Sequence, residues 1–511
     1  MREEEVALHV PGHQRGAAIH AKLKQFAGSA VFRMDLTELD GLDNLAAPSG
    51  AIATSQAAAA SLMGAGRSWW LVNGATAGVH AAILATCRPG GTIIMARNCH
   101  QSAFAACSLA GVVPHYIHPT TDPALGIAHG VDPSALSAAL AQHPRGSVGA
   151  VLVVSPTYFG ACADVAALSD LCHAHGVPLI VDEAHGSHLS LLASCAEHAR
   201  GERPPKAALQ SGADLVVQST HKTLGSLTQT ALLHASQESL GAGRTDAARI
   251  AKCLRTLQTS SPSYLLMASL DAAVARCRDE RDLFCEAAQC CRWARRELRR
   301  MGVHVLDAPS EEERNTNRGF VSQDPLRLTV AVDPALAGGR DGFAVAAWLE
   351  RPPRSIVAEM STPKVVVFCA GAATRQRDVQ RLVAAYTELL DDDRRAQPGA
   401  GRASDSRSAP ELPPGEMAEA PVIALTPRDA FFAATEAVPF AEAAGRVSAE
   451  LLSPYPPGVP LVAPGEVLTE GVLFTLSTVK AGGGSVVGLA DGSMETLLVV
   501  VEAEQQLRGE R

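Results

Sequence analysis

The chain has 511 residues, 47% of them hydrophobic, and its 44 Lys and Arg against 53 Asp and Glu give a net charge of −9. This length and apolar content can bury an ample core in two to four domains. The acidic balance without basic runs argues against nucleic acid as a partner. No apolar run reaches the ~18 residues that a membrane helix needs, so we predict no membrane segment.

The N-terminus, MREEEVALHVPGHQRG, is acidic and lacks the apolar core of a secretory signal. We therefore expect a cytoplasmic protein. A motif-like sequence already begins at Pro11. This abrupt start leaves open an upstream targeting segment or further domain, and with it a plastid location.

The 12 cysteines are scattered along the chain, and none form a CxxC pair. In a chain of this length they are typical of reduced, mostly buried thiols in an intracellular protein. The nearest cluster of metal-binding residue types, Cys172 to His175, has no second half elsewhere in the sequence. We therefore predict no metal site.

From Ser68 to Ser236, short apolar runs alternate with amphipathic helical patterns. Runs such as TIIMA, GAVLVVS, VPLIVD and DLVVQ are typical of parallel strands joined by crossover helices. The pattern predicts a doubly wound α/β domain with a mainly parallel sheet. Such folds bind ligands at the carboxyl ends of the strands.

After a long helical stretch over residues 244–301, the pattern changes to a small α+β unit, in which residues 307–324 resemble a surface insertion. A segment rich in Pro, Gly, Ser and charge follows, as expected of a disordered linker. The predicted divisions are a large domain at 1–300, a small α+β domain at 301–391, the linker at 392–417 and a C-terminal α+β domain at 418–511.

The turn NGATAG, from Asn73 to Gly78, lies between a predicted strand and a helix. Its small residues let backbone N–H groups and the helix N-terminus approach an anion, and Thr76 adds a hydroxyl. A Gly-rich turn of this kind is more often only a turn, so the motif needs support from its neighbours.

The second strand end reads VDEAHG, from Val181 to Gly186. DEAH also occurs in ATP-driven helicases, but that function needs a phosphate loop of the form GxxxxGK[ST]. The sequence contains no Gly-Lys dipeptide, so we reject the helicase alternative. The plainer interpretation is an acid that caps the next helix.

The third strand end reads QSTHKT and contains Lys222. Taken alone, Lys222 could be a solvated residue in a polar turn. Asp182 and Lys222, however, follow successive strands of one sheet, and an anion-binding turn is predicted at the same edge. This combination fits pyridoxal 5'-phosphate, whose ring nitrogen pairs with an aspartate and whose aldehyde binds a lysine.

Longer motifs extend this pattern over nearly the whole chain. They are HVPGHQRG, DLTELDGLDNLAAPSG, NGATAG, ARNCHQS, SPTYFG, VDEAHGSH, QSTHKT, LTPRDAFFA and SPYPPGVPLVAPGE. In this order they resemble the bacterial-type ornithine/lysine/arginine decarboxylases, pyridoxal-phosphate enzymes of the aspartate-aminotransferase fold. The resemblance is to a short form without the N-terminal wing domain.

The resemblance implies a role for each motif residue. Lys222 is expected to bind the cofactor aldehyde, Asp182 the pyridine nitrogen, and Ala184 to pack beneath the ring. His100 is expected to stack on the ring with His185 close by. The phosphate cup would be formed by Gly74, Ala75, Thr76, Ser219 and His221.

Three positions depart from the family pattern. Ala75 stands where the family often has a hydroxyl residue, and Gln14 and Gln101 stand where lysine is common. These changes leave the expected cofactor site intact but could alter substrate contacts.

The resemblance implies decarboxylation of a basic L-amino acid in polyamine synthesis, by a homodimer with shared active sites. Arginine is favoured over lysine and ornithine. A basic side chain needs a distal acid, and the candidates are Glu38, Asp40, Asp43 and Glu466. Glu450 and Tyr455 are expected to support the C-terminal wall of the site. His100, His185 and Lys222 are all candidate proton donors.

Two alternatives remain at this point. An aminotransferase or aldolase-type lyase would share the Asp182 and Lys222 geometry, but is not expected to carry the C-terminal YPPG and PGE motifs. A non-catalytic regulatory homologue would be expected to lose Lys222 or Asp182, and both are present.

Overall fold

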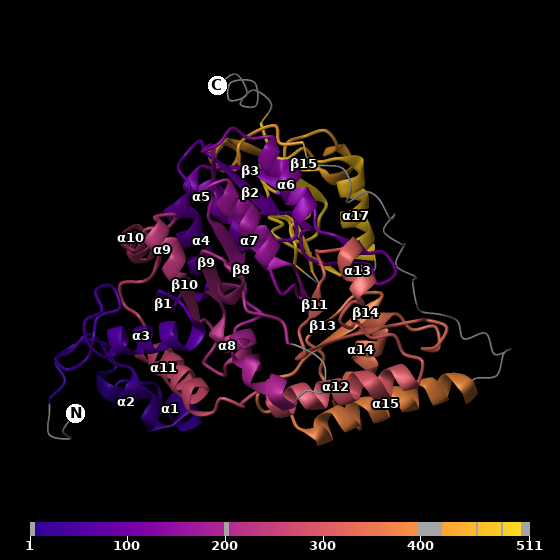
Figure 1. The fold of residues 1–511 in the computed structure, drawn as a ribbon, viewed down its shortest axis with the longest axis horizontal. Coiled ribbons are helices and arrows are strands. Elements are labelled where there is room, and N and C mark those ends of the chain that lie inside the picture. Colours follow the sequence, from indigo (N-terminus) through magenta and orange to yellow (C-terminus); the bar gives the residue numbers. More distant parts are fainter. Residues whose placement is uncertain (1–5, 199–203, 396–421, 456–457, 482–483, 502–511) are drawn as a thin grey trace.

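The computed structural model describes residues 6–198, 204–395, 422–455, 458–481 and 484–501. A seven-stranded sheet with the order β1-β10-β9-β8-β6-β2-β3 forms its centre (Figure 1). Neighbours from β9 to β3 pair in parallel, whereas β10 is antiparallel to both β9 and β1. The predicted α/β class with a mainly parallel sheet is confirmed. The strands are β1 (Arg67–Leu71), β2 (Thr92–Ala96), β3 (Val113–Ile117), β6 (Val148–Val154), β8 (Leu179–Asp182), β9 (Leu215–Gln218) and β10 (Ala231–Ala235).

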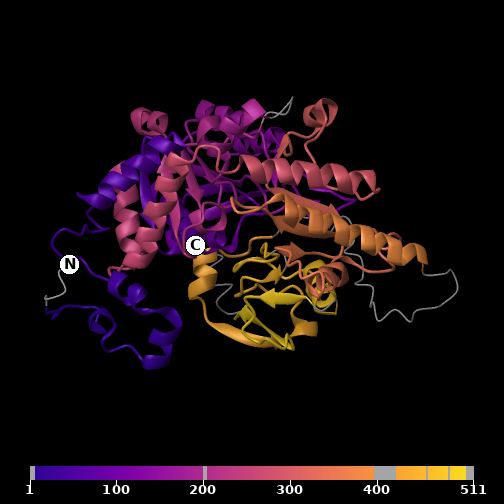
Figure 2. The same ribbon diagram turned by 90° about the horizontal axis from the view of Figure 1, so that it is seen from below.

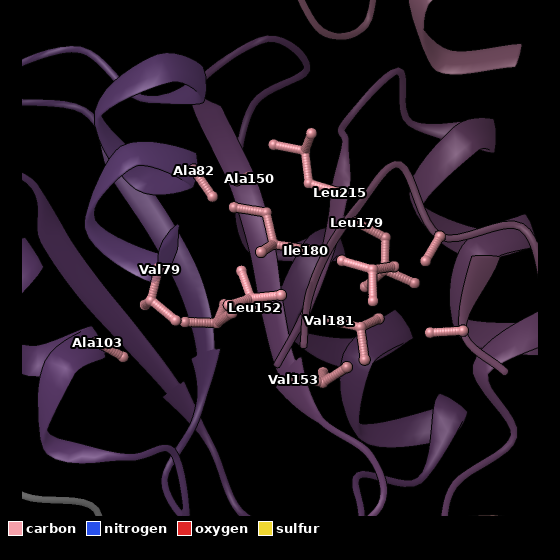
Figure 3. Packing of buried hydrophobic residues seen from close by; sticks show 14 of the residues in the cluster. Val79, Ala82, Ala103, Ala150, Leu152, Val153, Leu179, Ile180, Val181 and Leu215 are labelled. Atoms are coloured by element: carbon pink, nitrogen blue, oxygen red, sulfur yellow. The ribbon is translucent and has the colours of Figure 1, made fainter. Parts of the chain in front are cut away.

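The sheet is buried on both faces, which explains the continuous apolar runs of its strands. All four residues of β8 are buried, as are all four of β9. In Figure 3, Val79 and Ala82 of the helix after β1 lie close to the side chains of the central strands. The surrounding helices are α3 (Ala51–Met63), α4 (Gly74–Thr86), α5 (Gln101–Ala110), α6 (Pro133–Ala141), α7 (Val165–Ala174), α8 (Thr220–Thr223), α9 (Gln237–Ala242), α10 (Ala247–Leu257) and α11 (Tyr264–Asp279).

Helix α4 packs unusually close to the sheet at Gly78. A Cβ atom at this position would lie 2.6 Å from Leu71 Cδ1 and 2.9 Å from Val217 Cγ1. Both distances are shorter than carbon atoms tolerate, so the close approach needs glycine. This contact fixes the start of α4 against the ends of β1 and β9.

A second, three-stranded sheet with the order β12-β14-β13 lies beside the central one, among long helices at the lower right of Figure 1. The C-terminal half of α12 packs against α15 and this sheet in a shared apolar core. Its elements are α12 (Cys285–Arg300), α13 (Glu311–Thr316), β12 (Arg327–Ala331), α14 (Gly342–Glu350), β13 (Met360–Ser361), β14 (Val365–Cys369) and α15 (Gln376–Arg395).

The predicted surface insertion at 307–324 is right for its first half and wrong for its end. Residues 310–316 form the capped, exposed helix α13. Phe320 and Asp324 are buried, and Asp324 accepts a hydrogen bond from buried His188 at 2.9 Å. Two short antiparallel pairs lie outside the main sheets: β11 (Ser322–Gln323) with β7 (Ala161–Cys162), and β4 (Thr121–Asp122) with β5 (Ile127–Ala128).

The C-terminal segment has an apolar core of its own and is tied to the central sheet by Arg97. The Arg97 guanidinium donates to the carbonyls of Pro460 and Leu461, each at 2.7 Å. Because Arg97 directly follows β2, the C-terminal segment is held near the ligand-binding edge of the sheet. Its elements are α16 (Pro427–Phe432), β15 (Thr435–Pro439), β16 (Ser453–Tyr455), α17 (Glu470–Ala481), β17 (Ser485–Val487) and β18 (Thr496–Val500).

The N-terminal segment lies at one edge of the molecule, set apart from the main body in Figure 2. Its helices are α1 (Ala21–Ala27) and α2 (Ser29–Met34). Several large apolar side chains of this segment face solvent, and Phe26 is 90% exposed. The others are Val6, Leu8, Val10, Leu23 and Met34.

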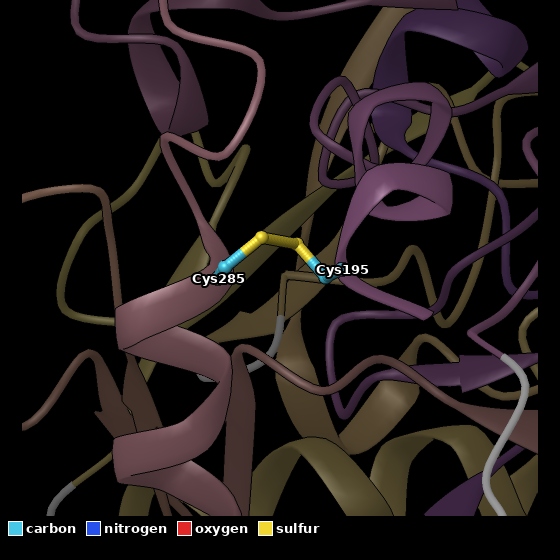
Figure 4. The surroundings of a disulfide bond; sticks show 2 residues. All are labelled: Cys195 and Cys285. Atoms are coloured by element: carbon cyan, nitrogen blue, oxygen red, sulfur yellow. A yellow bond between two sulfur atoms is a disulfide. The ribbon is translucent and has the colours of Figure 1, made fainter. Parts of the chain in front are cut away.

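Cys195 and Cys285 form a disulfide bond that joins the loop after β8 to the start of α12 (Figure 4). The expectation that all cysteines are reduced is therefore wrong for this pair. The partners are 90 residues apart in sequence, and only the fold brings their Cα atoms to 5.2 Å. Spacing along the chain carries no sign of this contact.

Most of the predicted linker lies outside the described residues, although α15 extends through 392–395. The domain divisions at 300, 391 and 417 remain predictions. In the part of the chain that the structure describes, no helix is long and apolar enough to cross a membrane.

Candidate active site

Four strands bring functional residues to one edge of the central sheet. β8 ends at Asp182, and β9 leads directly into α8, which contains Lys222. β1 leads into α4 at Gly74, and β2 leads to His100 at the start of α5. Because these strands run in the same direction, their carboxyl ends meet.

Lys222 is the centre of a hydrogen-bonded chain. Its Nζ lies 3.0 Å from Nε2 of His185, and Nδ1 of the same ring lies 3.0 Å from Nη2 of Arg327. A guanidinium can only donate, so Nδ1 must accept. The neutral imidazole then carries its proton on Nε2 and donates it to Lys222. This arrangement requires an amine with a free lone pair.

The electrostatics of the site shift the pKa of Lys222 toward its uncharged form. Loss of hydration lowers the pKa of its amine, and Arg327 lowers it further, although Asp182 and Glu359 act in the opposite direction. Burial also holds the pKa of His185 well below its ordinary value, with help from Lys222 and Arg327. Lys222 remains accessible to solvent, as a nucleophile for a small molecule must be.

Asp182 is positioned to bind a protonated ring nitrogen. Its side chain is 7% exposed, and Oδ1 accepts a hydrogen bond from the backbone of Ala184 at 3.1 Å. Within the described residues, no group donates to its second oxygen. A buried carboxylate with a free oxygen is suited to an added N–H donor.

His100 sits at the mouth of the site as the N-cap of α5. Its Nδ1 accepts a hydrogen bond from the backbone N–H of Ser102 at 3.2 Å. Loss of hydration lowers the pKa of this ring, Asp182 raises it, and Lys222 lowers it. His100 is thus brought together with both residues and is held as a neutral ring.

The start of α4 offers a place for a phosphate. No side chain caps this 13-residue helix. N–H groups of its first turn therefore receive no hydrogen bond from a capping side chain and can bind an anion. Gly74 has φ +74, and a Cβ there would meet nothing within 4 Å. Thr76 is exposed beside Ala75. The open turn leaves room for an anion to approach.

Two further predicted cup residues follow β9. Ser219 is buried at the start of α8, which also lacks a side-chain cap. His221 lies next to it, and its Nδ1 is 2.8 Å from the carbonyl of Thr230, to which it donates. Together with the α4 turn, these groups fit the phosphate of pyridoxal phosphate.

Two of the predicted distal acids, Asp43 and Glu466, are buried and paired within the protein, so neither is open to a substrate. Asp43 is buried and accepts backbone N–H bonds from Ser49, Gly50 and Ile52 at 2.8–2.9 Å, at the start of α3. Burial raises the pKa of Asp43, but these bonds outweigh it and lower the value to about 2. Asp43 is an anchor for the helix.

Glu466 is 2% exposed, and its Oε2 is paired with Arg97 at 3.2 Å and accepts from the backbone N–H of Ala463. Its Oε1 is buried without a hydrogen-bond partner in the described part of the chain. Both oxygens of Glu450 accept hydrogen bonds, from the backbone N–H groups of Ala490 and Leu498. Their place in sequence motifs therefore reflects structural roles, because motifs hold structural as well as functional residues.

Glu38 and Asp40 are exposed, and their substrate role remains a prediction. Tyr455 is 50% exposed on β16 and lies close enough to Tyr158 to raise its pKa. The C-terminal segment thus lies near Tyr158, and the role of Tyr455 in the wall of the site remains a prediction.

Three residues at the site escaped prediction. Arg327 comes from β12, Glu359 precedes β13, and the Tyr158 ring lies 4.4 Å from the His185 ring. Arg327 is 3% exposed, which is costly for a guanidinium without partners. Tyr158 lay within the SPTYFG motif, whereas nothing in the sequence singles out the other two.

Comparison with known proteins decides the family. A family model described as Orn/Lys/Arg decarboxylase, major domain, matches residues 1–377, and one described as the C-terminal domain of the same group matches 414–482. The chain belongs to the Orn/Lys/Arg decarboxylase family. It is a carboxy-lyase that acts on a basic amino acid.

Individual relatives agree with this assignment. The chain is 35% identical to an arginine decarboxylase of Bacillus subtilis over 97% of this chain and 95% of that protein. It is 26% identical to the lysine decarboxylase LdcA of Pseudomonas aeruginosa over 90% of this chain and 72% of that one.

Among solved structures, the lysine decarboxylase LdcF of Francisella novicida has a TM-score of 0.78 at 22% identity, covering 97% of this chain and 79% of that chain. The likeness at this low identity establishes the shared fold.

Proposed function

We propose that this chain is a pyridoxal-phosphate-dependent arginine decarboxylase that releases CO2 and the corresponding amine in polyamine synthesis. The observation that carries the proposal is the pairing of Lys222 and Asp182 on adjacent strand ends beside the open start of α4. The site thus has a nucleophilic amine, a carboxylate for a ring nitrogen and a place for a phosphate.

When bound, pyridoxal phosphate supplies an electron sink for the pair left behind as CO2 departs. Asp182 would hold a proton on the ring nitrogen, and Ala184 and His100 would line the ring. The first turn of α4, with Ser219 and His221, would hold the phosphate and so fix the cofactor beside Lys222.

The carbon that loses CO2 must receive a proton. His185 Nε2–H and Lys222 Nζ form a hydrogen-bonded pair at 3.0 Å, so a proton can pass between them. Arg327 keeps the opposite nitrogen of His185 occupied as an acceptor. His100, His185 and Lys222 all remain candidate donors for this step.

Arginine is favoured as the substrate because the relatives at 32–35% identity that cover at least 90% of this chain include four named arginine decarboxylases. Lysine and ornithine are the alternatives within the family. A cytoplasmic location is proposed with this role.

We infer that the functional form is a homodimer with shared active sites. The N-terminal segment, residues 6–34, exposes several large apolar side chains that a monomer would leave in water. A second copy of the chain would cover them. Sedimentation at micromolar concentration is expected to give a dimer, and a stable monomer would contradict this.

The test of the proposed function is the product. The purified chain with pyridoxal phosphate is offered L-arginine, L-lysine and L-ornithine separately, and products are identified by mass spectrometry. We expect agmatine from arginine and its loss in Lys222→Ala. Cadaverine or putrescine in place of agmatine would correct the substrate, and a 2-oxo acid would favour the aminotransferase alternative. No amine from any substrate would contradict decarboxylation.

A further inference from the structure

An acid that no motif singled out is joined to the site by a chain of contacts. Glu359 Oε1 accepts a hydrogen bond from the hydroxyl of Tyr158 at 2.7 Å. The Tyr158 ring lies 4.4 Å from the His185 ring, and His185 contacts Lys222 at 3.0 Å. Glu359 therefore lies at the rim of the same site.

The carboxylate of Glu359 is free to take another partner. The residue is exposed, and within the described part of the chain no group donates to its second oxygen. Its backbone N–H donates to Val367 at 2.9 Å, which fixes it at the edge of the small sheet. A fixed backbone and a hydroxyl on one oxygen hold the other oxygen in a defined direction.

The charge of Glu359 shifts the pKa values of two residues in the site. It favours the protonated form of Lys222, and after burial it is the main cause of the raised pKa of Tyr158. Arg327, the nearby guanidinium, is engaged with His185. A further cation at the rim would find Glu359 as its natural partner.

We propose that Glu359, oriented by Tyr158, binds the distal cationic group of the substrate side chain. This inference rests on the proposed function, since it concerns the basic substrate of the same site. It takes the place of Asp43, both of whose oxygens accept hydrogen bonds from backbone N–H groups, and of Glu466, which is 2% exposed and paired with Arg97.

A contact between Glu359 and a cationic side chain would explain why the enzyme acts on a basic amino acid. A carboxylate binds a guanidinium or ammonium through charge-assisted hydrogen bonds, which are about twice as strong as neutral ones. A substrate whose side chain ends in a neutral group would gain little from Glu359. Tyr158 acts as a positioning residue, because it holds the carboxylate.

The experiment compares Glu359→Gln with wild type on L-arginine, using L-citrulline, its neutral isostere, as a competing ligand. Removing a charge-assisted contact of about 1.5–3 kcal/mol raises KM for arginine roughly tenfold to a hundredfold. The inhibition constant for citrulline is expected to change much less. Tyr158→Phe should raise KM for arginine by a smaller factor.

Glu388→Gln is the matched control, because Glu388 is an exposed acid on α15 that pairs with Arg354 at 2.9 Å, outside the site. Its KM should equal that of wild type. Wild-type cofactor absorbance in Glu359→Gln shows that the variant is folded, and Glu359→Asp should recover part of the lost affinity.

An unchanged KM for arginine in a folded Glu359→Gln variant, or equal weakening of arginine and citrulline, would overturn the inference and leave the proposed function standing. Absence of any amine product from the wild-type protein would instead contradict the proposed function. The two failures are therefore distinguishable.

Discussion

Lys222 can attack an aldehyde only while its amine carries a lone pair, so the groups around Nζ govern its reactivity. Arg327 donates to Nδ1 of His185 and so fixes its tautomer, which leaves the proton on Nε2, facing the amine of Lys222. His100, Asp182 and Glu359 also interact electrostatically with Lys222. Among these charges, Arg327 opposes protonation of Lys222 and the two carboxylates favour it.

Replacing Arg327 with methionine should therefore raise the pKa of Lys222. The Lys222 pKa is lowered in the wild-type protein, so its amine becomes reactive at a lower pH than an ordinary lysine. In Arg327→Met one cause of the lowering is lost, and the reactive form should appear only at higher pH. Reductive methylation of the cofactor-free protein across a pH series, read by peptide mass spectrometry, measures the midpoint.

Arg381→Met serves as the control, since Arg381 is exposed on α15 and donates to the backbone of Arg354. An unchanged or lower midpoint in Arg327→Met would show that Arg327 does not keep Lys222 neutral. This readout does not depend on turnover.

At the scale of elements, the disulfide between Cys195 and Cys285 joins the loop after β8 to α12. It closes a loop of about 90 residues and so restricts the unfolded chain. Cys285→Ser should lower the free energy of unfolding by about 2–4 kcal/mol in oxidising buffer. Urea unfolding with and without dithiothreitol tests this.

In dithiothreitol the wild type and Cys285→Ser should become nearly equal. Cys253→Ser, which replaces a half-buried free thiol and keeps the bridge, should lose stability in dithiothreitol as the wild type does. Equal stability of wild type in both buffers, with free Cys195 and Cys285 peptides, would contradict the bridge.

The elements also explain what the sequence could predict. Asp182, Lys222 and Gly74 each follow a strand of one parallel sheet, and the geometry of such sheets brings their carboxyl ends together. Local pattern was therefore enough to place them at one edge. The contact of Arg327 with His185 joins β12 to the loop after β8, and no local pattern reports such a long-range contact.

For the acidic residues, in contrast, local sequence pattern did not identify the role. Asp43 and Glu466 lie in conspicuous motifs, yet their carboxylates are buried against backbone N–H groups and Arg97. A sequence gives residue types but not burial, so a structural anchor and a substrate ligand look alike. Glu359 had no motif and still lies at the rim of the site.

At the scale of the whole molecule, the site is assembled from three parts of the chain. The central sheet supplies Lys222 and Asp182, the small sheet supplies Arg327 and Glu359, and the C-terminal segment brings Tyr455 near Tyr158. Arg97 ties the C-terminal segment to the end of β2. Both the major and the C-terminal region of the family are present in this chain.

Trapping the cofactor on its lysine tests the role of Lys222 directly. The protein is loaded with pyridoxal phosphate, reduced with borohydride, digested and mapped by mass spectrometry. We expect a single phosphopyridoxyl group on Lys222, and none at any site in Lys222→Ala. A stable modification at another lysine, or none in the wild-type protein, would contradict the assignment of Lys222.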